Sequence, residues 1–412
     1  MPAAPPRPVR PAAPWADPYF TIGVTGTNGK TSTTRMIAAA IRAAGHPVLE
    51  ITTLGVRSDD RPRERGKSFH DFLAHLEAAA AEGARHAAIE VTSQALAGGY
   101  ARAWRFDLGV FTNLSPDHLS THRTWENYLA AKAQLFMHLG PGRTAVLNAA
   151  DPYALYLEQA IPADVRRLWF AAPSRGERRH PADLEADAIE LDPAGTRVML
   201  RPSPLADDLG GELRTRMVGE VFGENALAAA LAAHAAGLSP ESIRRGIAEA
   251  TVVPGRFEIV LQGPDRPLVA VDYAHTPDAL ARTCAAARRL AGERGRVLVV
   301  FGAGGGATPS KRGPMGEAVG HAADLAILTS DNPRREDPAQ IAAALLAGVR
   351  AGGRAAAEIQ LDRTLAIHRA LALAVPGDVV VIAGKGHESG QIVDGHTHPF
   401  VDADVVRAYL GA

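Results

Sequence analysis

Short apolar runs alternate with longer helical stretches rich in Ala, Leu and Arg from residue 19 onward. This alternation is typical of an α/β domain with a largely parallel sheet. The apolar runs predict strands over residues 21–24, 87–91, 108–112 and 144–148. The helical patterns cover residues 33–44, 71–82, 125–139, 225–236 and 240–250. A polar, proline-bearing segment over residues 174–207 is interpreted as an insertion or a strand-rich rim.

A second alternating series begins after Val253-Pro254-Gly255. It predicts strands over 268–271, 297–301, 325–329 and 378–382, and helices over 278–291, 315–322, 338–351 and 363–374. This is a doubly wound pattern, in which polar residues at the C-terminal ends of the strands bind ligands. We expect a proline-rich flexible tail (1–18), a central P-loop-type mononucleotide-binding domain (19–253) and a C-terminal Rossmann-like domain (254–412), with the active site in the cleft between the two domains.

The first predicted strand leads into a glycine-bearing loop, Thr25-Gly26-Thr27-Asn28-Gly29-Lys30-Thr31-Ser32. Its glycines allow tight turns that aim backbone N–H groups at phosphates, Lys30 adds a point charge, and the Thr31 hydroxyl can ligate magnesium at a helix start. The loop is a variant, because the usual pattern needs a glycine at position 24, which is Val24. The alternative is a plain strand-to-helix turn, but Lys30-Thr31 in register favours ATP binding.

Three further polar residues stand out in this half of the chain. Glu90 ends a predicted strand, His118 follows the next strand, and Lys132 lies in a mostly apolar helix. Glu90 and His118 can serve a metal ion. The alternative is that each is a satisfied structural residue, which is less expected beside a phosphate loop.

Composition and charge narrow the class of protein. The formal net charge of −1 gives no reason to expect nucleic acid or an anionic membrane as partner. The one cysteine, Cys284, excludes a disulfide within the chain and fits a reducing cytoplasm. The first 18 residues carry seven prolines, which argues against a signal peptide, and no segment has the apolar length needed to span a bilayer.

The chain resembles the Mur ligase family, which builds the peptide of the bacterial cell wall, and within it the enzymes of the MurE type that add the third amino acid. The resemblance runs from about residue 19 to 412. It rests on ten ordered motifs: Gly26-Thr27-Asn28-Gly29-Lys30-Thr31, Glu90-Val91-Thr92-Ser93, Thr112-Asn113-Leu114-Ser115-Pro116-Asp117-His118-Leu119, Asn148-Ala149-Ala150-Asp151-Pro152, Gly223-Glu224-Asn225-Ala226, Pro254-Gly255-Arg256-Phe257-Glu258, Asp272-Tyr273-Ala274-His275-Thr276-Pro277, Lys311-Arg312, Asp331-Asn332-Pro333-Arg334 and Gly384-Lys385-Gly386-His387-Glu388.

The resemblance implies a ligation in which a substrate carboxylate attacks the γ-phosphate of ATP, and an amine then displaces phosphate from the acyl phosphate. Two magnesium ions are expected, with Thr31 on one and Glu90 and His118 around the second. By family likeness Lys132 is carbamylated and becomes a carboxylate-like metal ligand. The resemblance also implies that Lys30 contacts phosphates. It makes Lys30, Lys132 and His275 the candidate catalytic residues.

The same likeness assigns the remaining nucleotide contacts. Adenine is expected near Asn225 and Asn148. From the second domain, Arg256 and Asp272 are expected to meet phosphate and ribose, while His275 faces the reacting phosphate. Closure of the second domain over the first brings these groups together and excludes water. For Arg256 the alternative is a surface salt bridge.

The incoming amino acid is addressed by Asp331-Asn332-Pro333-Arg334, which looks like the family version associated with meso-diaminopimelate. There the arginine pairs bidentately with the distal carboxylate. Arg312, Gly384 and Glu388 stand at matching positions and can hold the other carboxylate and the distal ammonium. The alternative is that Arg334 pairs with Glu336 or Asp337 at a helix start.

Departures from the family pattern concern the acyl acceptor. A typical member carries an N-terminal domain that binds the uridine nucleotide, where this sequence has a proline-rich tail. Lys67-Ser68-Phe69-His70-Asp71 replaces a Thr-Thr-Pro stretch, Gln94 stands where histidine is common, and 306–310 replaces a more charged turn. We therefore expect a short carboxylate acceptor, muramyl-peptide-like or other, with or without UDP, or a partner subunit that supplies its binding.

A basic loop in the acceptor-facing region can bind an acidic peptide or sugar, although a solvated loop is the simpler reading. It contains Arg57, Arg61, Arg63, Arg65 and Lys67. Two other functions remain open: an amino acid ligase resembling folylpolyglutamate or cyanophycin synthetases, and a nucleotide-binding partner protein that has lost catalysis. The 331–334 motif argues against the first, and the retained reactive residues argue against the second.

Overall fold

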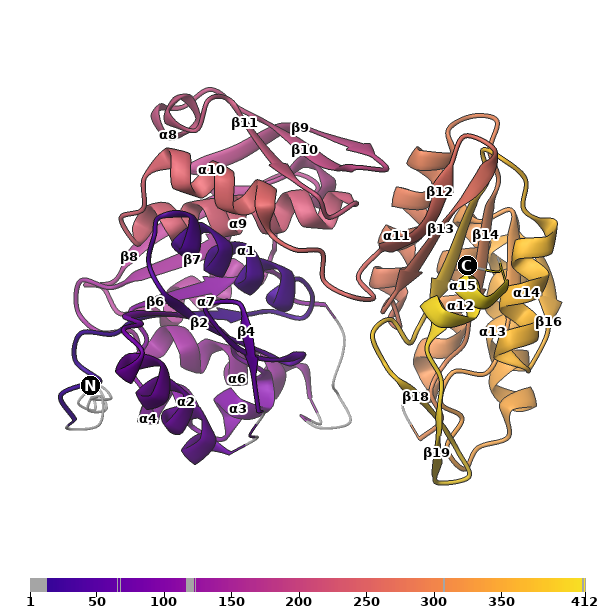
Figure 1. Cartoon of the computed structure of the whole chain (residues 1–412), viewed down its shortest axis with the longest axis horizontal. Coiled ribbons are helices and arrows are strands. Elements are labelled where there is room, and N and C mark those ends of the chain that lie inside the picture. The colour runs from indigo at the N-terminus through magenta and orange to yellow at the C-terminus, as the bar shows by residue number, and fades with distance from the viewer. Residues whose placement is uncertain are drawn as a thin grey trace. The chain divides into compact units, whose positions relative to one another are not determined.

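The computed structural model describes residues 13–64, 66, 68–115, 122, 124–306, 308–409 and 411. The chain divides into two compact units. The first contains Met1–Glu190, Thr196–Arg216 and Val221–Thr251; the second contains Leu191–Gly195, Met217–Glu220 and Val252–Ala412. Both are α/β units, as the sequence predicted (Figure 1).

The described part of the first unit holds an eleven-stranded sheet in the order β11-β10-β9-β8-β7-β6-β1-β5-β2-β3-β4. The ladders from β2 through β5, β1, β6, β7 and β8 to β9 are parallel, whereas β3, β4 and the β10–β11 pair are antiparallel additions at the two edges. The strands are β1 (Phe20–Thr25), β2 (Val48–Thr52), β3 (Gly55–Ser58), β4 (Arg61–Arg63), β5 (His86–Glu90), β6 (Leu108–Phe111), β7 (Thr144–Asn148), β8 (Arg166–Ala171), β9 (Leu184–Asp192), β10 (Gly195–Leu200) and β11 (Glu212–Thr215).

The 174–207 segment contributes β9 and β10, so it is a strand-rich rim that extends the sheet. The prediction of a basic loop from Arg57 to Lys67 is wrong for its first part, because β3 and β4 pair there as antiparallel strands. Their pairing satisfies the backbone at the sheet edge, which the arginine-rich sequence did not indicate.

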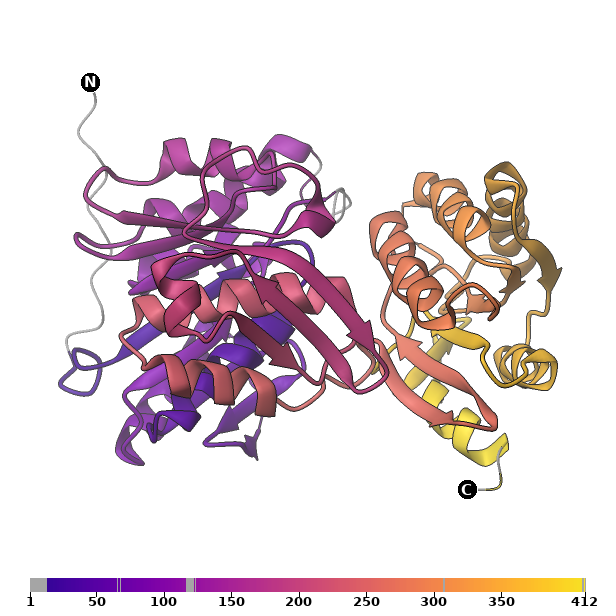
Figure 2. The same cartoon turned by 90° about the horizontal axis from the view of Figure 1, so that it is seen from above.

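Helices cover both faces of this sheet (Figures 1 and 2). On one face lie α1 (Lys30–Ala43), α9 (Glu220–Ala235) and α10 (Pro240–Glu249). On the other face lie α2 (Phe69–Ala81), α3 (Ser93–Ala97), α4 (Tyr100–Ala103), α6 (Trp125–Met137) and α7 (Ala154–Ala160); α8 (Pro204–Asp208) joins β10 to β11. Helix α1 begins three residues before the predicted start at 33, because Gly29 adopts φ +86° and turns the chain directly into the helix.

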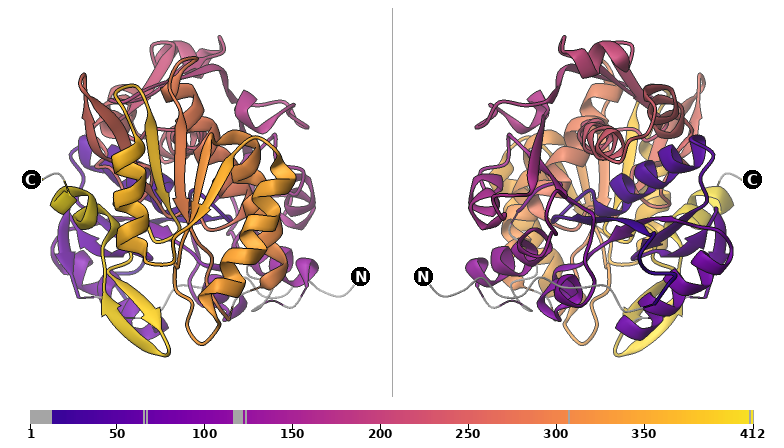
Figure 3. Two further views of the ribbon diagram at one scale, coloured as in Figure 1. Left: turned by 90° about the vertical axis from the view of Figure 1, so that its right-hand side faces the viewer. Right: turned by 90° about the vertical axis from the view of Figure 1, so that its left-hand side faces the viewer.

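The second unit holds a six-stranded sheet in the order β12-β13-β17-β14-β15-β16, parallel except for β12. Its strands are β12 (Glu258–Gly263), β13 (Arg266–Asp272), β14 (Val297–Phe301), β15 (Leu325–Leu328), β16 (Ala356–Ile359) and β17 (Val379–Ala383), with a separate hairpin of β18 (Gly390–Val393) and β19 (His396–Pro399). Helices α11 (Pro277–Ala291), α12 (Arg312–Ala322) and α13 (Pro338–Gly352) pack against one another, and α14 (Arg363–Leu373) packs against α15 (Asp402–Tyr409) (Figure 3). This is the doubly wound arrangement predicted from the sequence.

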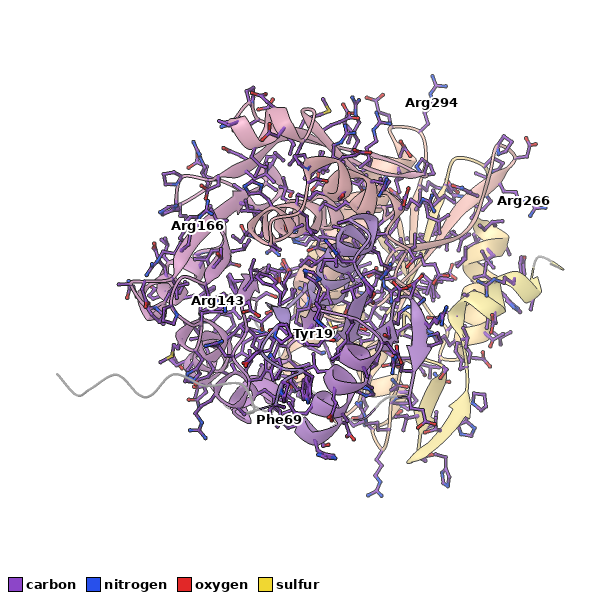
Figure 4. The ribbon with its side chains drawn as sticks, turned by 60° about the vertical axis from the view of Figure 1, so that its left-hand side comes forward. Tyr19, Phe69, Arg143, Arg166, Arg266 and Arg294 are labelled. Carbon is purple, nitrogen blue, oxygen red and sulfur yellow. The ribbon has the colours of Figure 1, made fainter. Side chains whose placement is uncertain are left out.

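Apolar strand residues form the core of each unit, and many arginines lie at the surface. The second core joins β13, β14, β15 and β17 to the apolar faces of α14 and α15. In Figure 4, Arg266 and Arg294 extend away from the ribbon of the second unit, in line with their exposure. Tyr19, by contrast, is buried just before β1, and burial raises the pKa of its hydroxyl.

A fully buried ion pair ties α14 to α15. Arg363 donates to both carboxylate oxygens of Asp402, at 2.7 and 2.8 Å, and neither side chain is exposed. The same guanidinium donates to the carbonyl of Ala383 at 3.0 Å, at the end of β17. The pair therefore anchors the chain just before the loop that begins at Gly384.

Replacing Asp402 with Asn should lower the free energy of unfolding by about 3 kcal/mol, because the Arg363 charge stays buried without its counter-ion. Urea unfolding followed by circular dichroism measures this. Asp404→Asn is the matched control, since Asp404 lies on the same helix, pairs with Arg407 at the surface and should change stability by about 0.5 kcal/mol or less. Equal midpoints for the two variants would contradict the importance of the buried pair.

Candidate active site

The phosphate loop connects β1 to α1 in the first unit. Lys30 Nζ donates to the carbonyls of Gly26 and Thr27, at 3.0 and 2.8 Å, so its charge lies over the loop. Gly29 has a left-handed φ, and a Cβ there would approach Asn225 Oδ1 to 2.3 Å. Asn225, on α9, therefore packs directly against the loop that we expect to bind phosphates.

Neighbouring strand ends hold the loop in shape. Asn113 accepts from the N–H of Asn28 and donates to its carbonyl, both at 3.0 Å, and the Thr112 hydroxyl donates to that carbonyl at 2.6 Å. The Thr27 hydroxyl lies 3.1 Å from the Tyr128 hydroxyl. These bonds fix the loop before any ligand arrives, which is the preorganisation that phosphate binding requires.

A carboxylate lies beside the first turn of α1. Glu90, at the end of β5, accepts from the Thr31 hydroxyl at 2.8 Å and from the Thr53 backbone and hydroxyl at 3.0 and 3.1 Å. A hydroxyl and a carboxylate at a phosphate loop fit Mg²⁺, which takes one or two protein oxygens and completes its shell with phosphates and water. Sequence reasoning missed Thr53, which follows β2.

Lys132 is almost fully buried on α6. Its Nζ donates to the Gly26 carbonyl at 2.7 Å and lies 4.5 Å from the centre of the Tyr128 ring. The helix thus brings Lys132 to the phosphate loop, as the sequence predicted for a reactive lysine. The carbamylation of Lys132 stays a prediction.

The predicted metal ligand His118 lies outside the described residues. A nearby histidine, His122, has its Nε2 2.9 Å from the Ser93 hydroxyl. Burial, and after it the charge of Lys132, lowers the pKa of His122. Both effects favour the neutral form of the His122 imidazole, which lies beside Ser93.

Asn148 lies at the end of β7 with its side-chain amide engaged by main chain. It donates to the Thr112 carbonyl at 2.8 Å and accepts from the Ala150 N–H at 3.0 Å. In this arrangement Asn148 fixes the end of its strand against that of β6. Its expected contact with adenine stays a prediction, as does that of Asn225.

In the second unit, the predicted nucleotide residues gather at the end of β13. Arg256 stacks over the Tyr273 ring with its guanidinium carbon 4.4 Å from the ring centre. Asp272 accepts from the N–H groups of Phe257 and Ala274, at 2.6 and 2.8 Å. Burial raises the pKa of Asp272, against the opposing charge of Arg256. Arg256 therefore stacks on Tyr273 beside the buried Asp272, and its contact with the nucleotide stays a prediction.

His275 is held at the same place. Its Nδ1 lies 2.8 Å from the Tyr273 carbonyl, and Lys311 Nζ donates to the His275 carbonyl at 3.1 Å. The Tyr273 contact leaves Nε2 as the nitrogen that points away from its own main chain. The role of His275 at the reacting phosphate stays a prediction.

The predicted amino-acid residues converge at the carboxyl ends of β15 and β17. Asn332 donates to Glu388 at 2.8 Å, and a Cβ on Gly384, whose φ is +113°, would meet Asp331 Oδ2 at 2.9 Å. Asp331 and Asn332 are buried. The structure thus brings together two motifs that are more than 50 residues apart, at the carboxyl ends of two parallel strands that flank β14 in the sheet.

Arg312 and Arg334 lie beside this cluster. Arg334 adopts φ +56° and donates to the Gly305 carbonyl. Arg312 pairs with Glu336 at 2.7 Å. The N–H of Gly306 and then Arg312 lower the pKa of Glu336. The alternative pairing of Arg334 with Glu336 or Asp337 is therefore wrong: Glu336 binds Arg312, and Asp337 caps α13 through the N–H of Ala339.

The predicted basic acceptor loop is largely neutralised where it is described. Arg57 pairs with Asp60 at 2.9 Å, and Arg63 pairs with Glu82. Arg61 is exposed, while Arg65 and Lys67 lie outside the described residues. Two of these arginines are thus strand-edge residues with local partners, which favours a solvated edge over an anion site.

Membrane insertion finds no support in the described helices, each of which is too short or too polar to cross a bilayer.

The first unit carries a phosphate loop at the end of its parallel sheet. The second carries a cluster of charged residues, predicted to bind an amino acid, at the end of its own sheet. Together these features define an ATP-using α/β enzyme. Family comparison gives the particular family. The Mur ligase middle domain matches residues 24–233, and the Mur ligase, glutamate ligase domain matches residues 255–386. The chain belongs to the Mur ligase family.

Named relatives and solved structures agree with this assignment. The chain is 40% identical over 397 residues to the UDP-N-acetylmuramoyl-L-alanyl-D-glutamate--2,6-diaminopimelate ligase of Streptomyces coelicolor, covering 94% of this chain and 75% of the relative. It is 39% identical over 393 residues to the protein of that name from Solibacter usitatus, covering 94% and 76%. A solved structure of a ligase with that name is 32% identical with a TM-score of 0.67, covering 96% and 78%. Folylpolyglutamate synthase of Mycobacterium tuberculosis shares the fold, with a TM-score of 0.68 at 20% identity, covering 97% and 92%.

These findings confirm the predicted family and enzyme class. The chain is an ATP-dependent, ADP-forming ligase that joins a carboxylate to an amino acid, similar to the MurE type of peptidoglycan synthesis. Members of the family depend on ATP and generally need Mg²⁺, in agreement with the predicted cofactors. The similarity to folylpolyglutamate synthase, at 20% identity, concerns the fold alone and does not support the alternative function of a folylpolyglutamate-type ligase.

Proposed function

We propose that this chain joins an amine of 2,6-diaminopimelate to the terminal carboxylate of a muramoyl-L-alanyl-D-glutamate acceptor, with ATP converted to ADP and phosphate. The observation that carries the amine assignment is the convergence of Asp331, Asn332 and Glu388 beside Arg334. Carboxylates suit the ammonium groups of such an amino acid, and an arginine suits its distal carboxylate. The names of the relatives support the same substrates.

The reaction starts on the first unit. An acceptor carboxylate oxygen attacks the γ-phosphorus, the bond to the β-phosphate oxygen breaks, and ADP leaves with an acyl phosphate as the other product. The loop N–H groups and Lys30 are proposed to bind the phosphates, with Gly26, Thr27, Asn28, Gly29 and Ser32 forming the cradle. Such a transfer depends on positioning and on neutralising charge, which this loop is built to provide.

Two magnesium ions are proposed. Thr31 would hold one beside the loop, while Glu90, His118 and a carbamylated Lys132 would hold the second. Bound Mg²⁺ would neutralise the charge that develops on the phosphates. The Thr31 hydroxyl lies 2.8 Å from Glu90, which supports two ion positions close together beside the loop.

The amine step belongs to the second unit. The substrate nitrogen attacks the acyl carbon, phosphate leaves with the bonding electron pair, and the nitrogen loses a proton. Asp331, Asn332, Gly384 and Glu388 are proposed to orient the amino acid, with Arg312 and Arg334 on its carboxylates. Arg256, Asp272 and His275 are proposed to reach the nucleotide, together with Asn148 and Asn225.

Several broader assignments accompany this function. We propose functional domains over 19–253 and 254–412 and a cytoplasmic location. ATP as co-substrate and the single buried cysteine support that location. Acceptor binding by this chain alone is the simplest arrangement, and a partner subunit is the alternative.

Phosphate release from ATP and Mg²⁺ in the presence of meso-diaminopimelate tests the proposal. UDP-muramoyl-dipeptide and its UDP-free counterpart serve as parallel acceptors, with products identified by intact mass. Turnover requiring both diaminopimelate and one of these acceptors is the expected result, and the more active acceptor shows whether UDP is needed. Glutamate-dependent extension of a folate would favour the folylpolyglutamate alternative. Nucleotide binding without turnover on any acceptor would favour a non-catalytic partner or a missing subunit.

A further inference from the structure

A buried lysine underlies the amino-acid cluster of the second unit. Lys385 follows Gly384 in the loop after β17, and its side chain has no exposed surface. Its Nζ donates to Asn332 Oδ1 at 3.0 Å and to Glu388 Oε2 at 3.1 Å, and it lies 3.7 Å from Asp331 Oδ1. One ammonium thus contacts all three side chains proposed to bind the substrate amine.

The cluster is layered by depth. Lys385 lies at the bottom with zero exposure, whereas the Glu388 side chain is 34% exposed. Asn332 is fixed from three sides, because its Oδ1 also accepts from the Ile392 N–H at 3.0 Å and its Nδ2 donates to Glu388 at 2.8 Å. The lysine therefore sets the side-chain orientation of residues that reach the surface, and it cannot itself reach a substrate.

The charges of the cluster do not balance within it. Asp331 and Glu388 contribute two negative charges and Lys385 one positive charge, so these three side chains sum to −1. Of the two arginines beside them, Arg312 is paired with Glu336, and Arg334 donates to the Gly305 carbonyl and is the group proposed for a substrate carboxylate. Arg363 lies nearby, but Asp402 already neutralises it. Asp331 Oδ1, moreover, is a buried oxygen for which the described residues offer no hydrogen bond. The remaining negative charge matches a single ammonium group supplied from outside.

We infer that Lys385 is a positioning residue of the amino-acid subsite: it orients Asn332 and Glu388 and leaves one carboxylate charge for one ammonium of the incoming diamino acid. The inference rests on the proposed function. It distinguishes Lys385 from a merely structural lysine, because removing it should impair binding of the amino acid and spare that of ATP.

The test is steady-state kinetics of Lys385→Met with meso-diaminopimelate varied at saturating ATP, and then with ATP varied. The KM for diaminopimelate should rise about 10- to 100-fold, as expected for loss of charged hydrogen bonds, while the KM for ATP stays within about twofold. Arg296→Met is the matched control, because Arg296 pairs with Asp378 at the opposite end of β17. It should leave both KM values unchanged.

A double-mutant cycle with Glu388→Gln tests whether Lys385 acts through Glu388. Lys385→Met should cost less in the Glu388→Gln background than in the wild type, because the two share one interaction. Additive effects, or a diaminopimelate KM within about twofold of wild type, would overturn the inference. If Lys385→Met does not fold, the double variant compared with Glu388→Gln replaces it, and failure of both to fold would make Lys385 a folding residue instead.

The assay of the wild-type protein distinguishes failure of the Lys385 inference from failure of the proposed ligase function. Wild-type protein that shows no diaminopimelate-dependent turnover overturns the proposed function and the inference together. Active wild-type protein with an unaffected Lys385→Met variant overturns the inference alone.

Discussion

Replacing Lys132 with alanine should abolish ligation, lowering kcat by at least about 10³-fold, because the substitution removes a charged group from beside the phosphates. The buried Nζ lies 2.7 Å from the Gly26 carbonyl, so the substitution removes a cation that contacts the phosphate loop directly. Phosphate release with all substrates present measures the loss. Full activity in the alanine variant would remove Lys132 from the site.

Chemical rescue distinguishes the two possible roles of Lys132. A carbamate forms when the neutral amine adds to CO₂ and loses a proton, and it then acts as a carboxylate. Acetate or propionate should therefore restore part of the activity to Lys132→Ala if the carbamate is the working form. An inactive variant that no carboxylate rescues would instead assign Lys132 as a cation bracing the Gly26 carbonyl.

A control substitution on α6 separates the loss of the Lys132 amine from a general disturbance of the helix. Gln134 lies two residues further along α6 and bonds to Ala130 and His138 of that segment. Gln134→Ala should keep kcat within about twofold of wild type, since Gln134 is half-buried and these hydrogen bonds lie within its own helical segment. Comparable losses in both variants would mean that α6 had been disturbed.

Local sequence patterns predicted the fold class, the long helices and eight of the parallel strands. The strands at β7 and β14 have the predicted limits, because continuous apolar runs bounded by polar residues leave little choice of boundary. Strands β2, β8, β11, β12 and β16 were not predicted, and neither were β3, β4, β18 and β19. The last four lie at or beside a sheet edge or in the separate hairpin. They are short, partly exposed and charged or rich in turn residues, so pairing with a neighbour, rather than local pattern, makes them strands.

The residues of the candidate site were likewise predicted in part and missed in part. Thr31, Glu90 and Lys132 were predicted from motif position, and the structure brings all three to the phosphate loop. Thr53 and the bracing role of Lys385 were missed, because each depends on a contact made across the sheet. A lysine between two glycines carries no periodic signal, and only its zero exposure and its three partners indicate a function.

Replacing Arg334 with alanine should lower kcat/KM for diaminopimelate by about 10²- to 10³-fold, because a bidentate arginine–carboxylate pair supplies two charge-assisted hydrogen bonds. The backbone of Arg334 makes its own hydrogen bonds, since its N–H donates to the carbonyl of Ile392 and its carbonyl accepts from the N–H of Asp394. Alanine keeps both of these bonds. The expected loss therefore reports on the side chain, and the KM for ATP should stay within about twofold.

Selectivity, rather than total activity, decides the role of Arg334. Lysine, which lacks the distal carboxylate, should be used about equally by wild type and Arg334→Ala, so the preference for diaminopimelate collapses in the variant. Arg335→Ala is the matched control, since Arg335 is the next residue and is also exposed. Equal losses for both amino acids would mean that the Arg334 contact with the Gly305 carbonyl shapes the loop, and that another group reads the distal carboxylate.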